Sequence, residues 1–336
     1  MHSKRNRNPK LLAGLATGVA VLLFVMLFSV LRGIQSFGVR ELWQAYALFD
    51  GSNEHLLIST VRMPRTLIAA AVGASLAMAG VIMQVLTRNP LASPSVFGIN
   101  AGASLCVVAA LVLYGSSLTI GGMIPIALAG AAVTAVIVFV LGSLGGGKLD
   151  TARLTLAGAS IAAFSASLTS GLILLNGQAL EDALFWMIGS VSGRKLEHLQ
   201  QVLPYMSLGW LVALGIGPSL NVMALGDDNA KGLGMRLKLV QSLAAAAVIL
   251  LAGSSVAAAG PIAFVGLMVP HVCRAIAGED HRWLLPYSAV AGALLLVGAD
   301  LLSRFVLMPR EVPVGIATAL LGVPFLIAIA RRRKHD

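Results

Sequence analysis

NVMALGDDNAKGLGMRLK, residues Asn221 to Lys238, is a polar, glycine-punctuated stretch between two long apolar segments. It holds five charged residues, whereas residues 211–218 before it and 239–258 after it hold none. Because charged side chains are costly in hydrocarbon, the stretch must lie in water on one side of a membrane. Its glycines divide it into short helix-like pieces, which indicates a docking surface rather than a slack linker.

The composition around this stretch is that of a polytopic membrane protein. The 336 residues are 57% hydrophobic and only 11% charged, whereas soluble domains carry about 25% charged residues. The apolar runs suit helices, which need ~20 residues to cross a bilayer. They are too long for the alternating strands of a membrane barrel. We therefore expect an all-α fold forming one domain over residues 1–336.

The apolar runs predict about ten spans. The first follows KRNRNPK and is interpreted as a retained span rather than a signal peptide, because it is long and lacks a small-residue cleavage site. The eighth is short and contains Pro270, which favours a half-span helix packed against protein or a cavity. The predicted spans are 11–31, 63–86, 95–114, 123–144, 154–175, 199–219, 237–258, 264–278, 283–305 and 313–330.

The positive charges predict the orientation of these spans. An even number of spans puts both termini on one side, and cytoplasmic loops favour Lys and Arg. With cytoplasmic termini, sixteen of the 24 Lys and Arg residues fall inside and eight fall outside. The net charge of +10 thus reflects span ends rather than a nucleic-acid partner. The 221–238 stretch is predicted to be cytoplasmic.

A short internal repeat favours a transporter architecture. Residues 73–82 read GASLAMAGVI and residues 253–262 read GSSVAAAGPI, with six of ten positions identical. The two segments belong to the second and seventh spans, so they are expected to run in opposite directions. Inverted repeats of this kind are common in transporters. The small residues also permit close helix approach, which is their simpler interpretation.

Enzyme chemistry finds little support in the sequence. GSLGGGK at residues 142–148 matches the start of a phosphate-binding loop, but Leu149 follows where a Ser or Thr is required. If the chain moves cargo with ATP, another subunit must hydrolyse it. Cysteine and histidine spacings resemble no metal site. We predict no catalytic residue, no metal site and no cofactor.

Ionisable residues at the predicted outer ends of spans are the residues that do indicate a specific interaction. Asp300 and Arg304 are four positions apart in the ninth span, which puts them on one helical face. We predict an intramembrane ion pair there, which Glu311 can join. Arg62 and Arg65 lie at the mouth of the second span, against the positive-inside trend. Since arginine makes forked bonds to carboxylates, contact with lipid headgroups or with an acidic partner would explain them.

Several long stretches together resemble a known family. They are RMPRTLIAAAVGASLAMAGVIMQVLTRNPLASPSVFGINAGAS at 62–104, GPIAFVGLMVPHVCRAIAGEDHRWLLP at 260–286, and GADLLSRF at 298–305 with EVPVGIATALLGVPFLIAI at 311–329. The family is the FecCD-like permeases, the membrane subunits of ABC importers for ferric siderophores, haem and cobalamin. The resemblance covers nearly the whole chain. It varies most at the N-terminus and in the loops around 36–55 and 176–198.

The resemblance implies partners for this chain. They are a second permease subunit, identical or paralogous, two ATP-binding cassette subunits, an extracytoplasmic substrate-binding protein, and ferric siderophore as cargo. It implies that Arg62, Arg65 and Arg304 receive acidic residues of the binding protein. It also implies that the 221–238 segment couples to the ATPase, with these residues at the contact: Leu225, Gly226, Asp227, Ala230, Gly232, Leu233 and Gly234.

The sequence therefore predicts a multi-pass ABC importer permease of the large-chelate type in a bacterial cytoplasmic membrane, carrying ferric siderophore. Import of cobalamin or haem is the alternative within the same family. A membrane-embedded hydrolase would need paired acids or a nucleophile with a base, and an ion-driven transporter would need more intramembrane carboxylates. Asp300 is the one clear intramembrane carboxylate of the sequence, which disfavours both.

Overall fold

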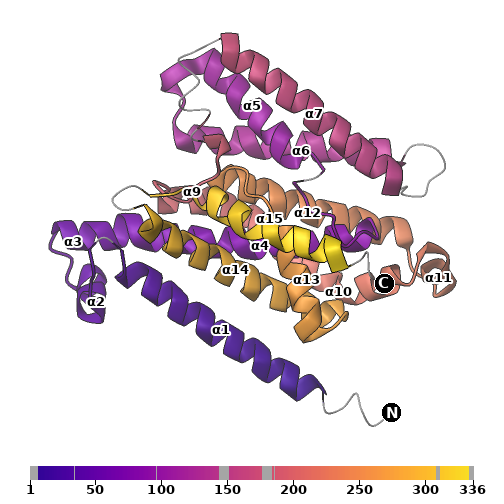
Figure 1. Ribbon diagram of the computed structural model, residues 1–336, viewed down its shortest axis with the longest axis horizontal. Coiled ribbons are helices and arrows are strands. Elements are labelled where there is room, and N and C mark those ends of the chain that lie inside the picture. Colours follow the sequence, from indigo (N-terminus) through magenta and orange to yellow (C-terminus); the bar gives the residue numbers. More distant parts are fainter. Residues whose placement is uncertain are drawn as a thin grey trace.

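The computed structural model describes residues 7–33, 35–95, 97–143, 151–175, 184, 186–307 and 311–332. Every element in these ranges is helical (Figure 1). The elements are α1 (Arg7–Leu31), α2 (Val39–Ala47), α3 (Asn53–Leu56), η1 (Leu57–Arg62), α4 (Met63–Leu86), α5 (Ile99–Tyr114), η2 (Gly115–Ser117), α6 (Ile120–Ser143), α7 (Thr151–Leu175), α9 (Leu196–Gly215), α10 (Gly217–Ala224), α11 (Asp227–Gly232), α12 (Leu237–Ala259), α13 (Val265–Ala277), α14 (His281–Val306) and α15 (Val314–Arg332).

The helices confirm the predicted all-α membrane fold. Six are long and apolar enough to cross a bilayer, and α9 with α10 makes a seventh span that is bent by 54°. Three shorter apolar helices, α5, α13 and α15, complete an approximate total of ten. The predicted half-span helix is α13, 13 residues long with Pro270 inside it.

One predicted span differs from its observed shape. The sixth, expected as a single run over 199–219, bends after Gly215, and its second piece leads into the polar stretch. Gly217 and Pro218 begin that piece, and glycine and proline are the usual causes of sharp bends in helices. The bend therefore joins a membrane span directly to the first helix of the polar segment.

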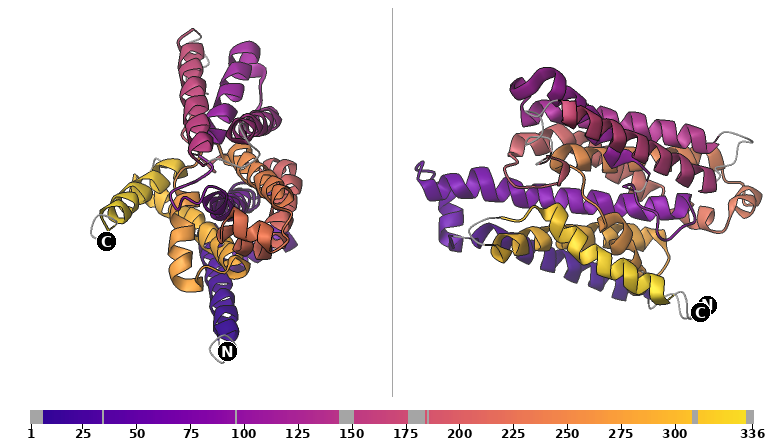
Figure 2. Two further views of the ribbon diagram at one scale, coloured as in Figure 1. Left: turned by 90° about the vertical axis from the view of Figure 1, so that its right-hand side faces the viewer. Right: turned by 45° about the horizontal axis from the view of Figure 1, so that its top comes forward.

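Helix α4 forms the centre of the bundle. It appears end-on in the middle of Figure 2, left, with other helices around it. Of its 24 residues, those from Val81 to Leu86 are buried without exception, and most of the remainder are buried too. It contacts α14, α12, α13 and α9. A helix that is apolar and buried all round is a core helix.

Glycines set the distance between α4 and its neighbours. A Cβ atom on Gly73 would overlap the carbonyl oxygen of Gly292 on α14. A Cβ atom on Gly80 would overlap the carbonyl oxygen of Gly266 on α13. Small residues at such positions let helix backbones approach closely in a membrane, where dispersion contacts replace the hydrophobic effect as the main attraction. The close helix packing predicted for the small residues of segment 73–82 is confirmed at Gly73 and Gly80.

The ends of the bundle can be distinguished in Figures 1 and 2. We call one end the α2 end, because α2 and α3 lie there, and the opposite end the α11 end. The beginning of α1 and the end of α15 both lie at the α11 end, as the even number of spans predicts. Helices α4 and α12 pack together and run in opposite directions, in agreement with the predicted relation between the two repeat segments.

The glycine contacts predict a position-specific effect on stability. Gly80→Ala should lower the melting temperature of the purified protein, because overpacking a tight core costs about 1–3 kcal/mol. Gly298→Ala on α14 is the matched control, since a Cβ there meets nothing within 4 Å and alanine favours the helix. Thermal melts in detergent test this pair. Equal melting temperatures for the two variants would contradict the packing argument.

Candidate functional site

A buried cluster of charged side chains lies at the α2 end. Asp300 accepts from two arginines: Arg65 Nη2 lies 2.8 Å from its Oδ1, and Arg304 Nη2 lies 2.6 Å from its Oδ2. Arg65 Nη1 also lies 2.5 Å from Glu311 Oε2. Asp300 is 1% exposed, and both arginines are 5% exposed or less. The carboxylates thus supply the counter-charge that these buried guanidiniums require.

The cluster confirms the predicted pair of Asp300 and Arg304, and adds a residue that spacing could not identify. Arg65 lies 235 positions from Asp300 and joins it only because α4 packs against α14. Glu311 joins the cluster as expected, and it accepts hydrogen bonds from Arg65 and Ser192. The signal for Arg65 in the sequence was its place at a span mouth, against the charge trend.

The C-terminus of α1 is held by two arginines, Arg62 and Arg304. Arg62 Nη1 donates to the carbonyl of Val30 at 3.0 Å, and its Nη2 donates to that of Gln35 at 2.6 Å. Arg304 Nη1 donates to the carbonyl of Ser29 at 2.7 Å. The last carbonyls of a helix have no partner within it, and cationic side chains satisfy them well. Bonds within the chain therefore explain why some of the arginines lie at the α2 end.

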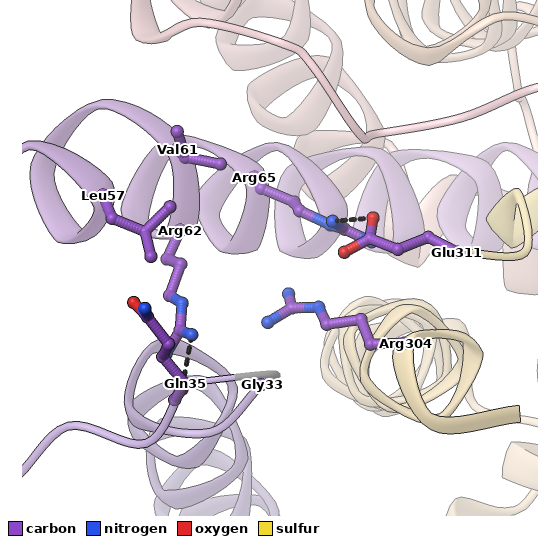
Figure 3. A pocket seen from close by; sticks show the side chains of 8 residues that line it. All are labelled: Gly33, Gln35, Leu57, Val61, Arg62, Arg65, Arg304 and Glu311. Atoms are coloured by element: carbon purple, nitrogen blue, oxygen red, sulfur yellow. Dashed lines mark hydrogen bonds and ion pairs between the residues drawn. The ribbon is translucent and has the colours of Figure 1, made fainter. Parts of the chain in front are cut away.

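The three arginines predicted to receive an acidic partner meet at one pocket of about 200 Å³ (Figure 3). In Figure 3, Arg62 points towards Gln35 and Arg65 towards Glu311. All three guanidiniums already have partners within the chain, and Glu311, whose side chain is 33% exposed, is the most accessible of the ion-pair partners. The pocket is lined by Gly33, Gln35, Leu57, Val61, Arg62, Arg65, Arg304 and Glu311.

The polar stretch forms a compact surface at the α11 end. Helix α10 ends at Ala224, and Gly226 then turns the chain with a φ of 106° into α11. Ala230 is fully buried beneath α11, whereas Leu225 and Leu233 are 60% and 67% exposed. The two short helices and the glycine breaks agree with the predicted pieces. Exposed leucines on an ordered surface are typical of a protein contact.

Polar bonds attach this segment to the membrane helices. Asn221 Nδ2 donates to Asp280 Oδ1 at 2.7 Å, and its Oδ1 accepts from the backbone N–H of His281 at 2.8 Å. Hydrogen bonds from Arg282 and Asn221 hold the pKa of the Asp280 carboxyl well below its usual range. Asp227 forms an ion pair with Arg88, just beyond the end of α4, at 2.5 Å. No pattern in the sequence indicated these anchors.

The part of the chain that the structure describes holds no candidate metal site. No group of three or more His, Cys, Asp or Glu residues is placed to hold a metal ion there. Residues 144–148 of the loop that resembles a phosphate-binding motif lie outside the described residues. The two candidate surfaces described above lie at opposite ends of the membrane bundle.

Because Arg65 and Arg304 share the Asp300 carboxylate, we predict that its loss destabilises the protein more than the loss of the Glu311 carboxylate does. Asp300→Asn should destabilise the protein strongly, because breaking a buried ion pair costs about 3–5 kcal/mol, and here Arg304 loses its carboxylate while Arg65 keeps only Glu311. Glu311→Gln is the matched control and should cost less, since its side chain is partly in solvent. Thermal melts of both variants in detergent give the comparison. An Asp300→Asn variant as stable as Glu311→Gln would contradict the role of the shared carboxylate.

Comparison with known proteins agrees with this geometry. The "Probable siderophore transport system permease protein YfiZ" of Bacillus subtilis is 47% identical over 319 residues, covering 94% of each chain. The Fe(3+)-citrate import system permease protein YfmD of the same organism is 41% identical over 334 residues, covering 99% of each. The cobalamin import system permease protein BtuC of Halobacterium salinarum is 37% identical over 279 residues, covering 83% of this chain and 74% of that protein.

A solved structure and a family profile extend the agreement to the whole fold. An inward-facing ABC transporter, described as being of the metal-chelate type, superimposes with a TM-score of 0.81. It is 27% identical in sequence, and the match covers 96% of this chain and 99% of that one. The profile of the FecCD transport family matches residues 21–332. The chain, a membrane permease subunit of the ABC transporter type, belongs to the FecCD transport family.

Proposed function

We propose that this chain imports ferric siderophore across the cytoplasmic membrane, using ATP that a separate subunit hydrolyses. The observation that carries the proposal is the near full-length similarity to permeases whose names specify siderophore and ferric citrate transport. The cobalamin permease is more distant and aligns over less of its own length. Ferric chelates are therefore favoured over cobalamin or haem as the cargo.

Uptake of radioiron tests the cargo. Cells with and without this gene, grown at limiting iron, are supplied with a panel of ferric siderophores and with ferric citrate. Loss of uptake for one chelate class in the deleted strain is the expected result, and labelled cobalamin serves as the control cargo. Loss of cobalamin uptake with unchanged iron uptake would overturn the assignment in favour of the alternative.

We propose an orientation from the charges together with the fold. The α11 end carries both ends of the described chain and is proposed to face the cytoplasm because of the Lys and Arg bias. The α2 end then faces outward, towards a substrate-binding protein. Two ATP-binding cassette subunits and a second permease subunit complete the proposed importer. Such an assembly puts the two surfaces of this chain against different partners.

The polar segment is proposed to dock on an ATPase subunit. Its exposed leucines supply apolar contact, and its anchors make it move with the membrane helices: Asp227 bonds to Arg88 at the end of α4, and Asn221 bonds to the first turn of α14. ATP binding and hydrolysis would shift the helices only through contacts that differ between two states. Leu225, Gly226, Asp227, Ala230, Gly232, Leu233 and Gly234 are the proposed coupling residues.

Gly232 offers a clean test of this contact. A Cβ there meets nothing within 4 Å, so Gly232→Trp adds bulk to the surface without an internal clash. We expect normal folding and at least a tenfold loss of ATP-driven uptake, whereas Gly232→Ala, the matched control, should retain transport. Gly226 is less suitable, because its φ of 106° strains any substitute.

Vesicles that contain the whole importer allow uptake and ATP hydrolysis to be measured together. Transport by the Gly232→Trp variant at the wild-type rate would show that the coupling contact lies elsewhere.

The arginine pocket is proposed to receive carboxylates of the binding protein. Docking through Arg65 would require an exchange of partners, with the incoming carboxylate displacing Glu311, the exposed member of the cluster. Arg62 and Arg304 would keep their bonds to α1. In this mechanism the cluster is a preformed acceptor whose inner carboxylate, Asp300, stays in place.

A further inference from the structure

One more arginine at the α2 end differs from those in the cluster. Arg194 is only 6% exposed, and its hydrogen bond in the structure is from Nε to the carbonyl of Ser190, a long one at 3.4 Å. Within the described residues, no carboxylate forms an ion pair with it. Arg65 and Arg304, by contrast, each contact a carboxylate. Among the described residues, Arg194 is thus a buried cation without the carboxylate contact that Arg65 and Arg304 have.

Such a cation is costly to keep. Burial lowers the pKa of the Arg194 guanidinium to about 10, so the side chain remains charged at neutral pH. A buried charge is unfavourable unless a partner or water replaces the hydration that burial removes. Charged groups with perturbed pKa values cluster at functional sites.

A pocket opens over this side chain. It has a volume of about 510 Å³ and lies between the start of α4 and the start of α9, with Pro64 and Arg194 at its buried part. Its rim includes the exposed residues Lys195 and Glu197. The hydroxyl of Thr60, also in the lining, already donates to its own helix at 2.7 Å. Among the described residues, the Nη groups of Arg194 and the ammonium of Lys195 are thus donors of this lining that form no ion pair.

The pocket adjoins the arginine pocket, because Val61 lines both of them. Ser192, two residues before Arg194, accepts from Arg65 Nη1 at 3.4 Å and donates to Glu311 Oε2 at 3.2 Å. A partner that covers the cluster would therefore reach this pocket as well. An arginine that needs no exchange of partners is also better prepared for an incoming anion, since no internal bond has to break first.

We propose that the pocket over Arg194 receives a carboxylate side chain of the extracytoplasmic substrate-binding protein, in addition to the contacts at the arginine cluster. The guanidinium would donate two parallel N–H bonds to that carboxylate, the geometry that arginine favours, and Lys195 at the rim would add attraction. This inference rests on the proposed function, because it assumes that the α2 end meets a binding protein.

Binding measurements on the whole importer test it. The importer, with its ATPase subunits, is placed in nanodiscs, and the probe is the purified binding protein that supports transport by the wild type in vesicles. Arg194→Gln should weaken its binding about ten- to a hundredfold, the range for a lost charge-assisted bond. Arg194→Lys should recover part of the affinity. Arg40→Gln, which removes an exposed charge from α2, is the matched control and should leave the affinity unchanged.

Thermal melting separates docking from a structural role. Since no carboxylate of the described chain forms an ion pair with Arg194, Arg194→Gln should melt at or above the wild-type temperature while binding the partner more weakly. A lower melting temperature with unchanged affinity would overturn the proposal, and so would unchanged affinity with unchanged melting.

A second arm titrates citrate into the importer without the binding protein. Binding of citrate that depends on Arg194, together with unchanged affinity for the binding protein, would assign the pocket to a free carboxylate and overturn the proposal. If the proposed function itself failed, the wild-type importer would transport no ferric chelate with any binding protein. Failure of this inference alone would leave wild-type transport intact and the Arg194→Gln variant indistinguishable from it.

Discussion

The close approach of α4 to α14 is the constraint on which the rest of the structure depends. Gly73 and Gly292 lie so near each other that a methyl group on either would collide with the backbone of the other helix. Gly80 and Gly266 make the same kind of contact between α4 and α13. Lipid tails are as apolar as leucine, so dispersion contacts between backbones must supply much of the attraction. These glycines therefore fix the centre around which the other helices pack.

That packing also decides which charges can be buried. Arg65 projects from the beginning of α4, and Asp300 from the late part of α14, so the two meet only because the helices are held together. The shared carboxylate then holds Arg304, which in turn bonds to the end of α1. The buried charges of Arg65, Asp300 and Arg304 thus obtain partners from another helix. Arg62 completes the end of α1 in the same way.

The same two helices join the ends of the molecule. At the α11 end, Arg88 follows α4 and pairs with Asp227, while Asp280 caps α14 and bonds to Asn221. At the α2 end, α4 carries Arg65, and α14 carries Asp300 and Arg304, which complete the buried cluster. A displacement of the polar segment would therefore act on both helices at once. Packed helices transmit such a shift as rigid bodies because their interfaces resist gradual deformation.

The sequence by itself determined the fold class, the approximate number of spans and the existence of a polar segment between two of them, because hydrophobic run length and charge are local properties of the chain. It also determined the pair of Asp300 and Arg304, since four positions bring side chains together on one helix. Only the tertiary structure decided that Arg65 shares this carboxylate, that Asn221 holds α14, and that Arg194 lines a pocket without forming an ion pair to a carboxylate of the described residues. Those relations join residues far apart in the chain, and helix packing, which no local pattern specifies, is what brings them together.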